Sequence, residues 1–149
     1  MDALIIGPQH GLASAFARML RRQGRAVLQA IPADAADGER AAWLLDEAGD
    51  PPLVVVIDAA PYGLAHELMA LTRAQVVLVA EHRVASARPG VRPARTYTPR
   101  DAAGLTVVPL GRAGHRWIEL DGGRRQPMGA ERAAALVLRS CGVEAASCR

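Results

Sequence analysis

Apolar runs alternate with amphipathic stretches along most of the 149-residue chain. Five runs are short, continuous and rich in branched side chains, which is typical of buried strands. These predicted strands cover residues 3–6, 25–31, 53–57, 75–80 and 105–110. Because strands that alternate with helices form a parallel sheet with helices against its faces, the pattern predicts an α/β domain.

The stretches between the strands have the spacing of amphipathic helices. In the first, Leu12, Phe16 and Leu20 share one face, and Gly24 follows as a C-cap. Further helices are predicted at residues 39–49, 64–73 and 129–140, and a short edge strand at 117–120. The predicted domain covers residues 1–142 and contains an irregular loop at 81–104, and residues 143–149 form a C-terminal tail.

The composition argues against several classes of function. All 18 basic residues are arginine, 15 residues are acidic, and only 3% are aromatic. Arginine without stacking aromatics does not favour a nucleic-acid partner, and no apolar run approaches the roughly 20 residues of a membrane span. With no signal peptide, we expect a cytoplasmic protein that does not contact membranes. Two cysteines and four scattered histidines predict no metal site.

A turn containing two glycines connects the first predicted strand to the first helix. Gly7 and Gly11 are separated by three residues, and Ala13 follows. Glycines at such a turn permit tight bending and let the backbone approach a pyrophosphate at the helix N-terminus. The first thirty residues therefore predict a Rossmann-like fold, although any strand-to-helix turn of an α/β protein can carry two glycines without binding a ligand.

This stretch resembles the nucleotide turn of the short-chain dehydrogenase/reductase family, whose pattern is glycine, three variable residues, glycine, one residue and glycine. Ala13 replaces the third glycine. Asp34 resembles the family's adenine contact, and Ala59 is what remains of an Asn-Asn-Ala-Gly motif. The resemblance implies that the cofactor-binding residues are Gly7, Gly11, Ala13, Asp34 and Ala59.

The catalytic residues of the family are only partly present. Tyr97 resembles the catalytic tyrosine, but Asp101 occupies the lysine position, and no serine ends the predicted strand at 75–80. In the family, the tyrosine transfers a proton while hydride moves between nicotinamide and a carbonyl, and the lysine favours its phenolate. A carboxylate at Asp101 disfavours phenolate. The resemblance thus implies a shortened, degenerate member of the family.

We expect this chain to be a non-catalytic subunit that supports a homologous full-length dehydrogenase in a hetero-oligomer, with an interface near Leu68 and Leu71. Two alternatives remain open: a small NAD(P)-dependent oxidoreductase in which Tyr97 acts with Arg100, and a dinucleotide-binding sensor without chemistry. NAD(P) is expected to bind weakly or not at all, because no acidic residue ends the second predicted strand to bind a ribose.

Glu81 and His82 follow the fourth predicted strand, where open α/β sheets bind ligands. They are candidates for an acid–base pair, but neighbouring residues of an extended chain point to opposite sides. We therefore expect a solvated strand end. Trp43 is expected in the core or at an interface, and Trp117 at a sheet edge.

Overall fold

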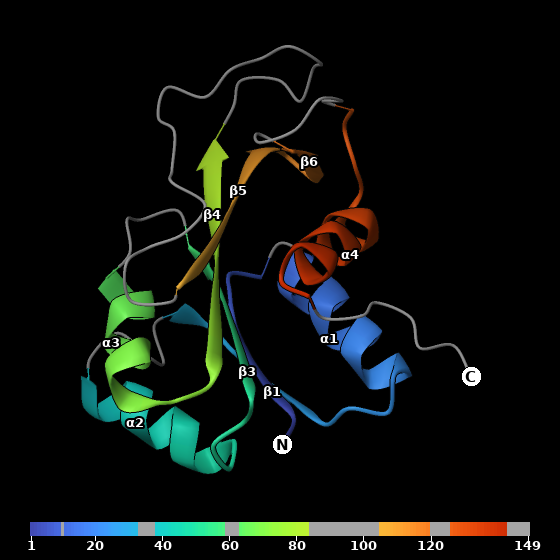
Figure 1. The fold of residues 1–149 in the computed structure, drawn as a ribbon. Coiled ribbons are helices and arrows are strands. Elements are labelled where there is room, and N and C mark those ends of the chain that lie inside the picture. The colour runs from blue at the N-terminus through green and yellow to red at the C-terminus, as the bar shows by residue number, and fades with distance from the viewer. Residues whose placement is uncertain (10, 33–37, 59–62, 84–104, 120–125, 143–149) are drawn as a thin grey trace.

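The computed structural model describes residues 1–9, 11–32, 38–58, 63–83, 105–119 and 126–142. Within these ranges, a six-stranded sheet has the order β2-β1-β3-β4-β5-β6 and is flanked by helices (Figure 1). Strands β1 to β5 run parallel, and β6 returns antiparallel to β5. The predicted single α/β domain with a Rossmann-like parallel sheet is confirmed.

The predicted elements form, with ends that differ from the predictions by at most three residues. The strands are β1 Ala3–Ile6, β2 Val27–Ala30, β3 Leu53–Asp58, β4 Gln75–Arg83, β5 Thr106–Ala113 and β6 Arg116–Glu119. The helices are α1 Leu12–Arg22, α2 Gly38–Glu47, α3 Gly63–Leu71 and α4 Ala130–Ser140.

Two hydrophobic layers cover the sheet. Helices α1 and α4 pack against one face, and α2 and α3 cover the other (Figure 1). Along β1, Ile5 belongs to the layer of α1 and α4, whereas Leu4 and Ile6 belong to the opposite layer. Because β1 and β3 are buried on both faces, they read as continuous apolar runs rather than as alternating ones.

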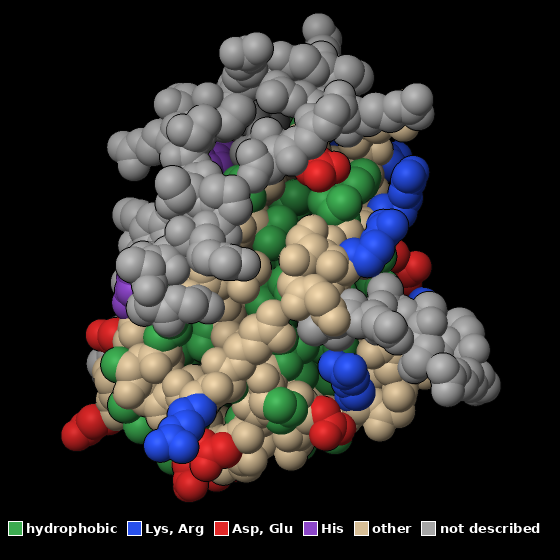
Figure 2. Space-filling model, viewed as in Figure 1, with side chains coloured by type: hydrophobic (Ala, Val, Ile, Leu, Met, Phe, Trp, Pro, Cys, Tyr) green, Lys and Arg blue, Asp and Glu red, His purple; other side chains and the backbone are tan. Residues whose placement is uncertain are grey.

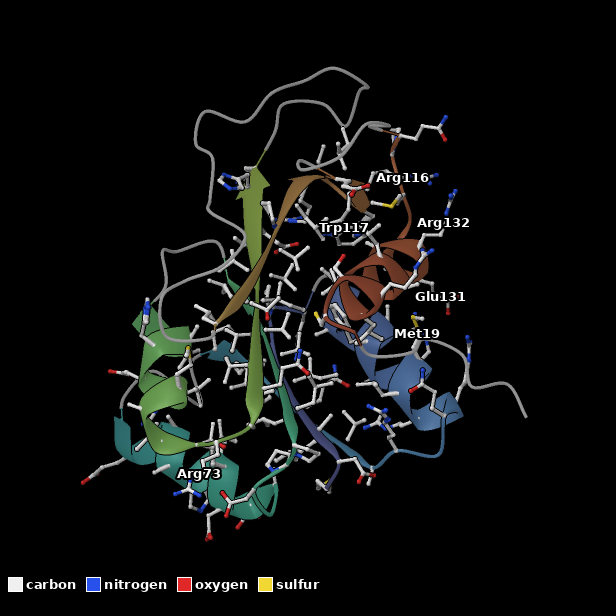
Figure 3. All side chains as sticks on the ribbon, in the orientation of Figure 1. Met19, Arg73, Arg116, Trp117, Glu131 and Arg132 are labelled. Carbon is white, nitrogen blue, oxygen red and sulfur yellow. The ribbon has the colours of Figure 1, made fainter. Side chains whose placement is uncertain are left out.

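Helix α1 follows its sequence pattern closely. Leu12, Phe16 and Leu20 are fully buried, and Met19 packs against their cluster from its edge (Figure 3). The helix ends before Gly24, which has a φ of 79°, the left-handed conformation that terminates helices. One buried stripe therefore fixes how α1 lies on the sheet.

Strand β4 is longer than the sequence indicated. It continues through Arg83 and pairs with β5 along seven residues, with Glu81 opposite Leu110 and His82 opposite Gly111. The assignment of residues 81–83 to the loop was wrong. Their side chains are polar, but their backbone continues the regular parallel pairing of β4 with β5. Residues 84–104 and the predicted tail at 143–149 lie outside the described residues.

Two side chains of the α2 and α3 layer are exposed. Trp43 is 59% exposed, so of the two expected positions the core is excluded and the interface stays a prediction. On α3, Leu68 is fully buried but Leu71 is 47% exposed, although helical spacing put both on one face. Leu71 is the last residue of α3. Leu68 belongs to the core, so a charge at Leu68 would disturb the fold, and the expected interface stays a prediction.

Candidate functional site

The strand order predicts a ligand site at the carboxyl ends of the parallel strands. Chain order reverses at β1, since β2 lies on one side of it and β3 on the other. Connections leave the sheet in opposite directions at such a point, so a crevice opens between them where open α/β sheets bind ligands. The turn that contains Gly7 and Gly11 begins at this end of β1.

Gly7 is required by packing. A Cβ at this position would lie 2.9 Å from Ile57 Cδ1, 3.1 Å from Ile57 Cβ and 3.2 Å from Ala13 Cβ. Real Cβ atoms hardly ever come that close to carbon, so a larger residue would push the turn away from β3 and α1. In the family pattern, close helix–strand packing is the role of the third glycine. Here Gly7 makes the room that lets Ala13 occupy that position.

Gly11 is required for its backbone conformation. It is the N-cap of α1 and has a φ of 99°, which L side chains rarely adopt. A Cβ built on it would meet nothing within 4 Å, so space is not the constraint. The first turn of α1 carries no acidic residue and no side-chain cap. Its backbone N–H groups can therefore donate hydrogen bonds to a bound anion.

A shallow crevice of about 320 Å³ lies beside this turn. It is lined by Gly7, Pro8 and Gln9 from the turn and by Gln29, Ala30 and Ile31 from the end of β2. Among these lining residues the polar side chains are two amides, and none carries a charge. The crevice is at the lower end of the size range of small-molecule sites and offers no carboxylate to a ribose.

Several residues of the predicted site cannot be placed. Asp34, Ala59 and Tyr97 lie outside the described residues, as does His10 of the glycine turn. Of the predicted cofactor-binding residues, Gly7, Gly11 and Ala13 come together at the carboxyl end of β1. Their arrangement is explained by the fold alone, through packing at Gly7 and backbone conformation at Gly11.

The end of β4 holds a polar group that sequence reasoning misjudged. Glu81 is only 5% exposed, and the Trp117 indole Nε1–H donates to its Oε2 at 2.7 Å. Arg112 Nε lies 3.8 Å from the same oxygen and supplies the opposite charge. The expected solvated strand end is therefore wrong. Glu81 joins β4 to the β5–β6 hairpin, and this carboxylate is not open to a ligand in the way an exposed base would be.

Trp117 is held from several directions. It lies opposite Arg112 across the β5–β6 ladder, and its backbone exchanges two hydrogen bonds with Met128 at 2.7 and 2.9 Å. Its ring is 1% exposed and belongs to the core beside α4 (Figure 3). The predicted edge position of Trp117 is confirmed, because β6 is the last strand of the sheet. The signal that could have indicated a buried acceptor for Trp117 was its indole donor on a short apolar strand, since a buried indole N–H usually finds a hydrogen-bond partner.

Cys141 is not a nucleophile in this fold. Its thiol donates a hydrogen bond to the Val137 carbonyl at 2.9 Å, and burial raises its pKa to about 11. The thiolate is the reactive form of cysteine, and almost none of it is present at neutral pH. In the described part of the chain, no cluster of three or more histidine, cysteine, aspartate or glutamate side chains could hold a metal ion.

Comparison with protein-family models, with curated proteins and with solved structures finds no match to this chain. Among the described residues, no helix is both long and apolar enough to cross a membrane. The observations that bear on function are therefore the open crevice beside β1 and the buried Glu81 cluster at the end of β4.

Proposed function

We propose that this chain is a shortened short-chain dehydrogenase/reductase-like protein that does not itself transfer hydride and that supports a complete, active relative as a non-catalytic subunit. The proposal combines the family-like glycine turn with the altered end of β4. Both features lie at the carboxyl edge of the sheet, in the chain order that the family resemblance implies.

The buried Glu81 cluster is the observation that carries the proposal. In the resemblance, the strand corresponding to β4 ends in the serine that donates a hydrogen bond to the substrate carbonyl. An ionised carboxylate only accepts hydrogen bonds, and one oxygen of Glu81 already accepts the bond from Trp117. A developing oxyanion would therefore meet a carboxylate that is already paired with Arg112, and not the hydrogen-bond donor that the family uses. Asp101 in the lysine position points the same way.

Exposed apolar side chains support the partner half of the proposal. Leu71 is 47% exposed and lines a depression of about 500 Å³ at the amino ends of β3 and β4. The same depression is lined by Asp50, Pro51, Pro52, Thr72, Arg73 and Ala74. A leucine beside two prolines at a concave surface is a suitable docking point for another chain. We therefore place the partner contact at Leu71 and not at Leu68.

Two measurements test this function. The isolated chain should show no oxidation or reduction of a panel of alcohols and ketones with NAD or NADP. Turnover that disappears in Tyr97→Phe would instead establish the oxidoreductase alternative. Coexpressed with a full-length short-chain dehydrogenase from the same source, the chain should copurify in fixed stoichiometry. Leu71→Glu should weaken that copurification while the fold survives, and the exposed change Glu67→Gln on the same helix is the matched control.

A dinucleotide-binding sensor is the second candidate, and the crevice beside Gly7 favours it. Titration calorimetry with NAD decides between weak and functional binding. A micromolar dissociation constant that Gln29→Glu abolishes would give the sensor priority, because the new carboxylate would repel phosphate within the crevice lined by Gln29. The glycines themselves are poor probes of binding, since replacing Gly7 or Gly11 also disturbs the fold.

A further inference from the structure

The two helical layers carry opposite charge. Helices α1 and α4 together hold five arginines and one glutamate, a net charge of +4. Helices α2 and α3 hold four carboxylates and one arginine, a net charge of −3 with His66 neutral. In Figure 2, acidic and basic side chains are mixed: acidic ones along the left and lower margins lie beside basic patches, and the basic side chains at the right lie beside an acidic one. The layers lie on opposite faces of the sheet, so the helices on the two faces differ in the sign of their net charge (Figure 1).

The outer side of α2 carries an acidic ridge, formed by Glu39, Trp43 and Glu47. These residues are spaced by four, so they follow one stripe of the helix over about 12 Å. All three are exposed, and Trp43 is 59% exposed although tryptophan is usually covered. Exposed tryptophan is a frequent anchor of protein interfaces, and carboxylates on both sides of the indole favour a cationic partner surface.

The outer side of α4 carries a basic ridge, formed by Arg132, Leu136 and Arg139. Their spacing of four and three residues places them on one stripe about 10.5 Å long. Both arginines are exposed, and the partly buried Leu136 lies between them. The ridge therefore repeats the order charged, apolar, charged that α2 shows, with the opposite sign and nearly the same length.

The single acidic residue of the α1 and α4 layer is turned away from the basic ridge. Glu131 Oε1 lies 3.4 Å from Arg22 Nη2 and 3.6 Å from Arg18 Nε, so it neutralises the seam between the two helices. Figure 3 shows Glu131 and Arg132 projecting from α4 on the side away from the sheet. Because Glu131 is engaged with α1, the positive charge of Arg132 and Arg139 remains available to another molecule.

From this match we propose that copies of this chain associate head to tail, with the acidic ridge of one copy lying on the basic ridge of the next. The Trp43 indole packs against Leu136, and the carboxylates of Glu39 and Glu47 pair with the guanidinium groups of Arg132 and Arg139. The chain contains no lysine, so every cation on the basic ridge is a planar guanidinium that can pair with a carboxylate through two bonds and stack on an indole.

The position of the ridges determines the symmetry of the assembly. Each copy presents its two ridges on opposite faces, so one pair of copies cannot satisfy both contacts at once. Such a heterologous contact leads to an open series or to a ring rather than to a twofold dimer. Because the contact is rich in exposed charge, salt should weaken it strongly. This association is separate from the proposed function, whose partner contact lies at Leu71.

Sedimentation velocity of the full chain tests the proposal. At low ionic strength the average mass should rise with concentration beyond that of a dimer, and at about 1 M salt, where the screening length is about 3 Å, it should fall to the monomer. The acidic-ridge variant Glu39→Gln/Trp43→Gln/Glu47→Gln and the basic-ridge variant Arg132→Gln/Arg139→Gln should each remain monomeric. All five positions are exposed, so both variants should fold.

Mixing the two variants gives the decisive result. One variant keeps only its basic ridge and the other only its acidic ridge, so the mixture should form a one-to-one heterodimer that grows no further. The exposed change Glu67→Gln on α3 removes one carboxylate that belongs to neither ridge and should assemble like the wild type. A wild-type monomer at every concentration, or an assembly that both ridge variants retain, would overturn the proposal.

Discussion

The two halves of the carboxyl edge of the sheet differ in what they offer to a ligand. Beside β1 and β2, the glycine turn leaves a crevice of about 320 Å³ lined by uncharged groups. At the end of β4, a carboxylate and an indole are used within the protein, since Trp117 donates to the buried Glu81. The two ends therefore differ physically: one is an open, uncharged crevice, and the other is a closed polar cluster whose groups are bound to one another.

The two halves also differ in the forces that hold them. Around Gly7 the constraint is steric, because carbon atoms of Ile57 and Ala13 fill the space that a side chain would need. Around Glu81 the constraint is electrostatic, because a desolvated carboxylate is stable only with its donor and counter-ion. Substitutions at the two places should therefore lower stability by different amounts and respond to different compensating changes.

The largest effect is expected at the end of β4. Glu81→Ala removes the acceptor of the Trp117 indole and the counter-ion of Arg112, and we expect it to lower the free energy of unfolding by about 3 kcal/mol. Glu81→Gln should have a smaller effect, because its amide oxygen can still accept from the indole. Chemical denaturation measures both. The exposed control Glu67→Ala should change the free energy of unfolding by no more than about 0.5 kcal/mol. A change as small as this in Glu81→Ala would contradict the structural role of the cluster.

The next largest effect is expected at the glycine turn. Gly7→Ala places a Cβ 2.9 Å from Ile57 Cδ1, and overpacking of this kind lowers stability by about 1–3 kcal/mol. Adding Ala13→Gly removes the 3.2 Å contact and should recover part of the loss. A double-mutant cycle by urea unfolding quantifies the coupling. If the two changes were simply additive, the direct packing of Gly7 on Ala13 would be refuted.

A smaller effect separates conformation from packing within the same turn. Gly11 and Gly129 are both N-caps with open space around their Cβ positions, but their φ angles are 99° and −74°. Replacing each by alanine removes the same capping preference, so only Gly11→Ala adds left-handed strain. Its loss of stability should exceed that of Gly129→Ala by about 1–2 kcal/mol. Equal losses in thermal unfolding would show that the left-handed turn is not maintained in solution.

Much of the fold could be predicted because local pattern and tertiary environment agree. The run at Leu53–Ile57 is apolar throughout because β3 has a helical layer on each face, and the stripe of α1 matches its single buried face. The glycine turn could also be predicted from the sequence. The positive φ of Gly11 is a property of the local backbone and depends on neighbouring residues only. Predictions failed where distant residues decide the environment.

Glu81 illustrates that failure. The polar side chain of Glu81 suggested the start of a loop, yet Glu81 lies inside β4. Its buried carboxylate is stabilised there by the hydrogen bond from Trp117, which lies 36 residues later in the sequence. For Trp43 and Leu71 the sequence left the environment open, because apolar character in a helix does not reveal whether another described element covers the side chain. The periodicity of a single sequence indicates helices and strands, but it does not indicate which distant residue will contact a given side chain.

NMR of the labelled protein during titration with NAD distinguishes the open crevice beside β1 from the closed Glu81 cluster at the end of β4. We expect weak binding, with shifts confined to the amides of residues 7–15 and 29–31. The indole resonance of Trp117 should stay unchanged and protected from solvent exchange, and that of the exposed Trp43 is the internal control. Shifts that reach Glu81 and the Trp117 indole would contradict this difference between the two ends, whereas a titration that leaves the glycine turn untouched would show that NAD does not bind.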